Sequence, residues 1–311
     1  MTGYDAQTVH TPYDDVFRTL LNDCSKLMIP VLNETFGEHY TGDETILFHQ
    51  NEHFLDRQDG NAEKRISDSS FTVIGEKRQQ YLYECQSTAD SSMLVRIFEY
   101  ATQIAIEQGE ILKHILCVKI PRCAVLFLRS TRNTPDQMKI HMETPGGAVG
   151  FDVPVTRVQK YSLEELFEKD LLFLIPFYIF KFEDRFWEYN TKEEKRKELE
   201  EEYTKIMNYL DERLIDGKIN AYIRKTLIEM SVKVLDHIAK KYENIREGVR
   251  VIMGGRILEY EAKTILREGI MKQAKETALN LYEMGMKEDF IAKAVNVSVD
   301  VVKQWLDLAG I

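Results

Sequence analysis

Two short runs decide how this chain folds: KRISDSSF at residues 64–71 and YECQST at residues 83–88. Side chains alternate between the two faces of a β-strand, so Glu84 and Gln86 in the second run project from the same face. A carboxylate and an amide on a face that also carries Leu82 are unusual, because such a face is ordinarily buried. The second run therefore predicts a strand on whose otherwise apolar face a carboxylate would be costly to bury without a partner.

A short loop centred on Glu76 separates the two runs, which predicts an antiparallel hairpin. Asp68 and Glu84 each lie eight residues from that centre and would face each other across the hairpin. Opposed residues have Cβ atoms about 5 Å apart, so the two carboxylates would repel each other unless they share a divalent cation. Two alternatives stay open from the spacing alone: a solvated face of the sheet, or ion pairs with Arg65 or Arg96.

Helical periodicity predicts a helix over residues 11–30 and another over 90–108, and period-two patterns predict strands between and after them. The predicted strands are 46–55, 65–74, 81–86 and 124–129, followed by a hairpin of 138–143 with 148–155. Ser162 and Glu165 match a capping box at the start of a further helix. The sequence thus predicts an α/β protein with a mixed sheet flanked by helices.

The length of 311 residues favours two structural units at ~150 residues each. Almost everything beyond residue 188 has a helical pattern, which predicts a first domain at 1–188 and a helical C-terminal region at 189–311. The final segment, 276–311, has the spacing of a helix-turn-helix. This segment has no excess of basic residues, so a role in oligomerisation or in capping the helical region is favoured over reading of DNA sequence.

The net charge of −10 is concentrated at one end, because residues 1–60 hold 11 acidic and 3 basic groups. No strong electrostatic attraction to DNA follows, and phosphate binding would need a metal ion or a local patch. The longest apolar run, 171–180, is too short to span a bilayer, which predicts no membrane segment. Residues 1–10 lack the features of an export signal, so we expect a cytoplasmic protein. We expect its four cysteines to be reduced and buried.

Together with RIFEY at residues 96–100, the two opening runs resemble the PD-(D/E)XK nuclease superfamily. The resemblance covers roughly residues 11–185 and is strongest to the Rpn-like branch, also described as PD-(D/E)XK nuclease family transposases. It implies a restriction-endonuclease-like fold and metal-dependent cleavage of phosphodiester bonds, usually in DNA. The expected cofactor is Mg²⁺ or Mn²⁺.

Carried over by motif, the resemblance makes Asp68 and Glu84 the metal-binding carboxylates, with Gln86 at the position where the superfamily usually has Lys. Glutamine cannot take a proton from water, so catalysis would depend more on the metal. An acidic residue of the first helix often completes such a site. Helical spacing favours Asp14 over Asp15, because Asp14 borders the apolar stripe more closely.

Arg96 and Tyr100 lie four residues apart on the predicted helix after the motif and would face the site together. They are candidates to hold a substrate phosphate, although an ion pair and a packed ring explain them equally well. The leading hypothesis is a DNA endonuclease linked to recombination or mobile elements, with DNA as substrate and with oligomerisation through the C-terminal helices. The alternative is an inactive nuclease-fold protein that binds nucleic acid or a protein partner, with Gln86 marking the lost activity.

Overall fold

The computed structural model describes residues 12–49, 52–56, 62–66, 70–87, 92–295 and 297–309. The chain divides into two compact units, Met1–Met253 and Gly254–Ile311. Residues 189–253, which the sequence pattern assigns to the helical region, thus pack in the same unit as the sheet.

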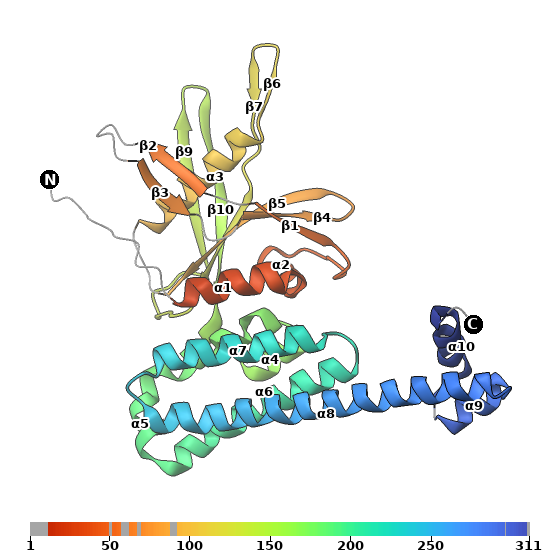
Figure 1. The fold of residues 1–311 in the computed structure, drawn as a ribbon. Helices are drawn as coiled ribbons and strands as arrows, with labels where there is room; N and C mark the ends of the chain where they lie inside the picture. Colours follow the sequence, from red (N-terminus) through yellow and green to blue (C-terminus); the bar gives the residue numbers. More distant parts are fainter. Residues whose placement is uncertain are drawn as a thin grey trace. The chain divides into compact units, whose positions relative to one another are not determined.

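A six-stranded mixed sheet forms the centre of the first unit (Figure 1). Its strands, in spatial order, are β1 (Thr45–Phe48), β4 (Ser70–Ile74), β5 (Arg78–Gln86), β8 (Arg122–Phe127), β10 (Gly147–Arg157) and β9 (Gln137–Thr144). The first three strands form an antiparallel meander, β8 pairs in parallel with both β5 and β10, and β9 pairs with β10 as the predicted hairpin. The prediction of a mixed α/β fold is confirmed.

The register of the β4–β5 hairpin agrees with the sequence-based prediction. Ser70 pairs with Leu82 and Ile74 pairs with Arg78, so the pairs are centred on Glu76. The parallel pairing of β5 with β8 requires a crossover connection, which helix α3 (Met93–Glu107) supplies. Asp68 itself lies outside the described residues.

The predicted strands 46–55 and 65–74 are each divided, because part of each run belongs to a separate sheet. There β2 (Glu52–Asp56) pairs with β3 (Ala62–Ile66) and with no other described strand. Both segments are rich in charged residues, which suits a small two-stranded sheet better than a strand covered on both faces. Alternation alone could not reveal which strands would pair.

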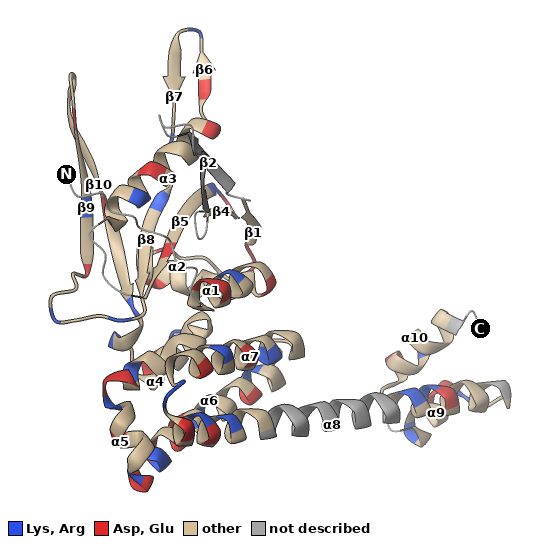
Figure 2. Ribbon diagram, turned by 60° about the vertical axis from the view of Figure 1, so that its left-hand side comes forward, with Lys and Arg blue, Asp and Glu red and all other residues tan. Residues whose placement is uncertain are grey.

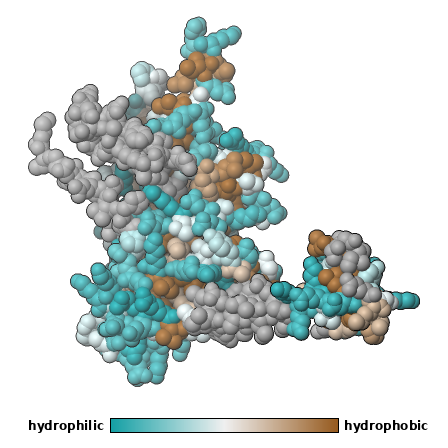
Figure 3. Space-filling view, viewed as in Figure 1, coloured by the Kyte–Doolittle hydropathy of each residue, from teal (hydrophilic) through white to brown (hydrophobic). Residues whose placement is uncertain are grey.

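A second two-stranded sheet was not predicted at all: β6 (Glu110–Leu112) with β7 (Ile115–Cys117). Ile111 is 76% exposed, and Leu112, Ile115 and Leu116 are each more than half exposed. They belong to the brown area just below the teal tip of the hairpin at the top of Figure 3. Cys117 is also exposed, so the prediction that all four cysteines are buried is wrong for this one, because it lies on a hairpin that no other described element covers.

Helices cover both faces of the sheet. α1 (Pro12–Asp23) and α2 (Met28–Phe36) lie on a face of aromatic side chains, where the Phe17 and Tyr83 ring centroids are 6.4 Å apart and those of Phe36 and Tyr81 are 5.1 Å apart. The predicted single helix 11–30 is interrupted by the 3₁₀ turn η1 (Ser25–Leu27). Pro30 therefore stands in the first turn of α2, where its missing N–H has no partner to lose.

On the opposite face, α3 packs against aliphatic side chains of the central strands. The buried cluster joins Leu82, Val125 and Phe127 from the sheet to Ile97 and Ala101 from the helix. Because β5 contributes alternate residues to the two faces, Tyr81 and Tyr83 belong to the aromatic side and Leu82 to the side of α3.

After β10 the first unit continues in helices alone: η2 (Val158–Lys160), α4 (Leu163–Glu168), η3 (Leu172–Arg185), α5 (Phe186–Thr191), α6 (Glu193–Ile215) and α7 (Ala221–Ile238). The capping box is confirmed: the Ser162 hydroxyl accepts from the Glu165 N–H, and the Glu165 carboxylate accepts from the Ser162 N–H. α7 packs against η3 and α1.

The charged run that begins α6 forms a solvent-facing surface of mixed sign, on which Figure 2 shows blue and red segments side by side. Lys197 pairs with Glu193 at 3.0 Å and Lys195 with Glu198 at 2.6 Å, the spacings at which helical neighbours meet. These exposed pairs contribute little to stability but keep the helix surface hydrated.

The long helix α8 (Glu243–Glu283) contains the division between the two units, and α9 (Glu288–Ala294) and α10 (Val299–Ala309) follow it. In the second unit, a small core joins these helices through Ala278, Ile291, Ala292, Val302 and Leu306. Gly285 adopts a left-handed φ of 81° after the end of α8, a conformation that favours glycine at this position. No helix in the described part of the chain is both long and apolar enough to cross a membrane.

Candidate active site

Glu84 and Gln86 lie together at the carboxyl end of β5, on the sheet face that α3 covers. Glu84 is 2% exposed and Gln86 is half-buried. Leu82, two residues earlier on the same face, is fully buried in the cluster under α3. The strand thus runs from an apolar interior to a polar end, with the carboxylate at the boundary.

The Glu84 carboxylate affects the pKa of a cysteine on the neighbouring strand. Glu84 pairs with Val125 and Leu82 with Cys123 in the parallel β5–β8 ladder. Burial, reinforced by the nearby Glu84 carboxylate, raises the pKa of the Cys123 thiol to about 12. A carboxylate in such surroundings is costly to desolvate unless a positive group or hydrogen-bond donors compensate it.

Arg96 and Tyr100 lie on α3, above this face, but their surroundings differ. Arg96 is half-buried, and its Nη1 donates to the Ser92 hydroxyl at 3.0 Å. Tyr100 is only 5% exposed and belongs to the aliphatic cluster with Leu82. Packing therefore accounts for most of the Tyr100 ring, whereas Arg96 is the better placed of the two to meet a ligand.

Asp14 and Asp15 occupy the first turn of α1 and differ in exposure. Asp14 is half-buried, and Asp15 is exposed with one carboxylate oxygen 3.4 Å from the Nζ of Lys233 on α7. This is the order of burial that helical spacing predicts for the two residues.

The donor chemistry of the described residues suits a hard divalent cation. Glu84 offers carboxylate oxygens and Gln86 an amide oxygen, which are ligand types that Mg²⁺ and Mn²⁺ accept together with water. Among the described residues, no group of three His, Cys, Asp or Glu side chains converges as a metal cluster. Asp68, the predicted second carboxylate, is not among those residues.

Arg129, which was not singled out from the sequence, lies just beyond the end of β8. It connects the carboxyl end of β5 with η3. Its Nε and Nη2 donate to the two carboxylate oxygens of Glu183 at 2.5 and 2.8 Å, and its Nη1 donates to the Ser87 carbonyl at 3.4 Å. The guanidinium also lies 5.8 Å from the Tyr13 ring centroid, next to Asp14 in the sequence. The sequence feature that could have identified Arg129 is its position just after an apolar strand.

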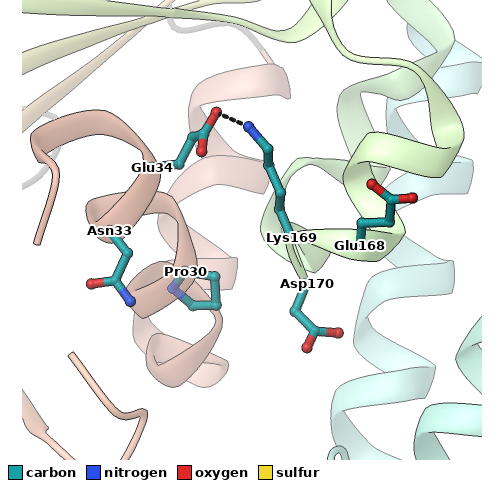
Figure 4. Close-up of a pocket in the computed structure, with 6 residues that line it drawn as sticks. All are labelled: Pro30, Asn33, Glu34, Glu168, Lys169 and Asp170. Atoms are coloured by element: carbon teal, nitrogen blue, oxygen red, sulfur yellow. Dashed lines mark hydrogen bonds and ion pairs between the residues drawn. The ribbon is translucent and has the colours of Figure 1, made fainter. Parts of the chain in front are cut away.

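A hollow of about 350 Å³ between α2 and α4 is separate from these residues (Figure 4). Lys169 reaches across it to Glu34 at 2.5 Å, and Glu34 also accepts from the Tyr161 hydroxyl at 3.2 Å. Asp170 at its rim accepts from the Tyr209 hydroxyl at 2.8 Å. These pairings connect helices to one another, so we assign this hollow a structural role.

Comparison of the chain with models of protein families, with curated proteins and with solved structures gives no match.

Proposed function

We propose that the protein is a metal-dependent endonuclease that hydrolyses phosphodiester bonds in DNA, with a restriction-endonuclease-like arrangement of β4, β5, α3 and β8. The observation that carries the proposal is the buried Glu84 carboxylate, followed two residues later by Gln86 on the same face of β5. The helix α1, the antiparallel meander of β1, β4 and β5, the helix α3 and the strands that follow support it, because the resemblance implies a helix, a three-stranded meander, a helix and further strands.

In this proposal Glu84 and Asp68 hold a Mg²⁺ or Mn²⁺ ion, and Asp14, whose helix α1 covers the opposite face of the sheet, would reach the ion around the end of β5. When bound, such an ion lowers the pKa of water and polarises the scissile phosphate. The Gln86 amide positions the attacking water through a neutral hydrogen bond, since it cannot remove a proton. The Arg96 guanidinium, half-buried on α3, is the group that would contact a phosphate oxygen.

A nicking assay on supercoiled plasmid tests the proposal, with Mg²⁺, Mn²⁺ or EDTA present. We expect metal-dependent nicking by the wild type, and a loss of about 100-fold or more in Asp68→Ala and Glu84→Gln, because each variant removes a charge that holds the cation. Asp14→Asn and Asp15→Asn form a matched pair on one helix turn. The first should impair nicking and the second should not.

Equal nicking by the wild type and Glu84→Gln, unaffected by EDTA, would show that the activity belongs to a contaminant. The alternative of a nuclease-fold binding protein would then replace the proposal.

A further inference from the structure

A polar hollow of about 280 Å³ lies on the same sheet face as Glu84 but at the other end of α3. Its walls come from the end of β1, from β4 and β5, and from the last turn of the helix and the residue after it. The lining residues are Phe48, His49, Ser70, Gln80, Ile104, Glu107 and Gln108.

Polar side chains fill sheet positions here that are apolar further along β5. Ser70 and Thr72 are each 1% exposed, and Gln80, which pairs with Thr72, is 9% exposed. The imidazole Nε2 of His49 lies 2.8 Å from the Thr72 hydroxyl, and the His49 N–H donates to the Ser70 carbonyl at 3.1 Å. The ring is thus fixed at the wall of the hollow.

Two buried polar atoms that line the hollow have no hydrogen-bond partner among the described residues: the Ser70 hydroxyl and the Gln80 amide nitrogen. Buried polar groups are almost always paired, because an unpaired one loses its hydration without compensation. The Gln80 N–H groups need an acceptor, and the Ser70 hydroxyl can either donate or accept. A ligand or ordered water must meet this demand from within the hollow.

We propose that this hollow binds a nucleobase with a lactam edge, guanine best of all. A lactam places a carbonyl acceptor beside an N–H donor. The carbonyl would accept from Gln80, while the N–H groups would donate to the Glu107 carboxylate at the rim, and guanine offers two such groups. Phe48 and Ile104 supply apolar surface for the faces of the ring. The volume is near the lower end of small-molecule sites, about 300 Å³, which suits one nucleoside.

We assign the base to a nucleic-acid strand whose phosphate lies at Glu84, and this assignment rests on the proposed function. Gln80 and Glu84 are four residues apart on β5, about 13 Å at the rise of a strand. The same strand of the sheet would thus hold a base at one end and the reacting phosphate at the other.

The test measures binding in EDTA, so that no cleavage is required. Fluorescence anisotropy follows a labelled single-stranded oligonucleotide with one guanine in an adenine background, against an all-adenine control. Calorimetry follows free guanosine and adenosine. We expect preference for guanine in the strand and a tenfold or greater loss in Gln80→Met, which keeps the side-chain shape but removes the amide.

Gln79→Met is the matched control, because Gln79 is the neighbouring residue and projects to the other face of β5. It should bind as the wild type does. The melting temperatures of Gln80→Met and Ser70→Ala should equal or exceed that of the wild type, since each removes a buried polar atom without a partner. Loss of binding in a stable variant excludes unfolding as its cause.

The inference is wrong if the wild type shows no preference for guanine in either form, or if Gln80→Met binds as well as Gln79→Met; the hollow then holds only water. Binding of guanosine alone supports the site but assigns it to a free nucleoside or nucleotide. Guanine binding without plasmid nicking overturns only the proposed endonuclease, whereas nicking without guanine binding overturns only this inference.

Discussion

At the residue scale, Glu84 and Gln86 differ in burial and in charge. Glu84 is 2% exposed beside an apolar cluster, so its charge has to be compensated locally. Gln86 is half-buried at the end of the same strand and carries no charge. Removal of the Glu84 carboxylate should therefore change the activity more than removal of the Gln86 amide.

Replacement of Gln86 by Lys should retain or raise plasmid nicking. An ammonium group at this position could orient or activate the attacking water, whereas the amide contributes one neutral hydrogen bond of about 1 kcal/mol, or roughly tenfold in rate. The measurement is the initial nicking rate in Mg²⁺ and in Mn²⁺. A loss as large as that of Glu84→Gln would mean that Gln86 itself binds the cation.

The four cysteines should differ in reactivity because only one is exposed. Cys117 lies on the exposed β6–β7 hairpin, whereas Cys24, Cys85 and Cys123 are buried. Burial raises the pKa of Cys24 and that of Cys123, the latter to about 12, so these two thiols stay protonated and unreactive at pH 8. Titration with a thiol reagent at pH 8 should show one fast-reacting group in the native protein and four in denaturant.

The fast reaction should disappear in Cys117→Ser and persist in Cys123→Ser. Two fast groups in the native protein would contradict the buried position of the other three cysteines.

At the element scale, local sequence signals decide where helices begin, and tertiary pairing decides where strands belong. The Ser162–Glu165 capping box starts α4 as predicted, because both hydrogen bonds form within four residues. By contrast, β2 and β3 pair with each other in a separate sheet, and alternation within each predicted strand did not show where that strand would divide. β6 and β7 form a hairpin that alternation did not reveal.

Ser162→Ala should lower the free energy of unfolding by about 1 kcal/mol, since it leaves the Glu165 N–H without its side-chain acceptor. Glu168→Ala, at an exposed position in the last turn of α4, is the control and should change stability by less than about 0.5 kcal/mol. Urea denaturation of the three proteins gives both values. Equal stabilities would show that the capping box does not support the helix.

At the scale of the whole molecule, the net charge of −10 opposes association with DNA. Residues 1–60 hold most of this charge, whereas the opening run of α6 carries both signs (Figure 2). A cation held at Glu84 would offset the repulsion at the place where the phosphate has to approach. Binding of DNA should therefore depend on divalent ions.

Replacing EDTA by Ca²⁺, which binds oxygen ligands but commonly supports no cleavage, should tighten binding of duplex DNA by about tenfold or more. The gain should be lost in Glu84→Gln and kept in Asp15→Asn, because only the first removes a proposed ligand. Filter binding at constant ionic strength provides the measurement. A gain of equal size in Glu84→Gln would indicate cations bound elsewhere on the acidic surface.

The local features of this protein follow from its amino-acid sequence alone. The sequence predicted the β4–β5 register about Glu76, the β9–β10 hairpin and the capping box, because turns, alternation and caps act over a few residues. The shared face of Glu84 and Gln86 follows from strand geometry alone. The same reasoning placed Asp14 closer than Asp15 to the buried stripe of α1.

The order of the six strands, the parallel pairing of β5 with β8 and the burial of Glu84 beneath α3 could not be predicted from the sequence. The tertiary structure also brought His49, Ser70 and Gln80 around one hollow, although polar residues at the buried positions of β4 and β5 were visible in the sequence. These features depend on contacts between segments far apart in the chain. Periodicity records which face a side chain occupies, whereas packing determines what covers that face.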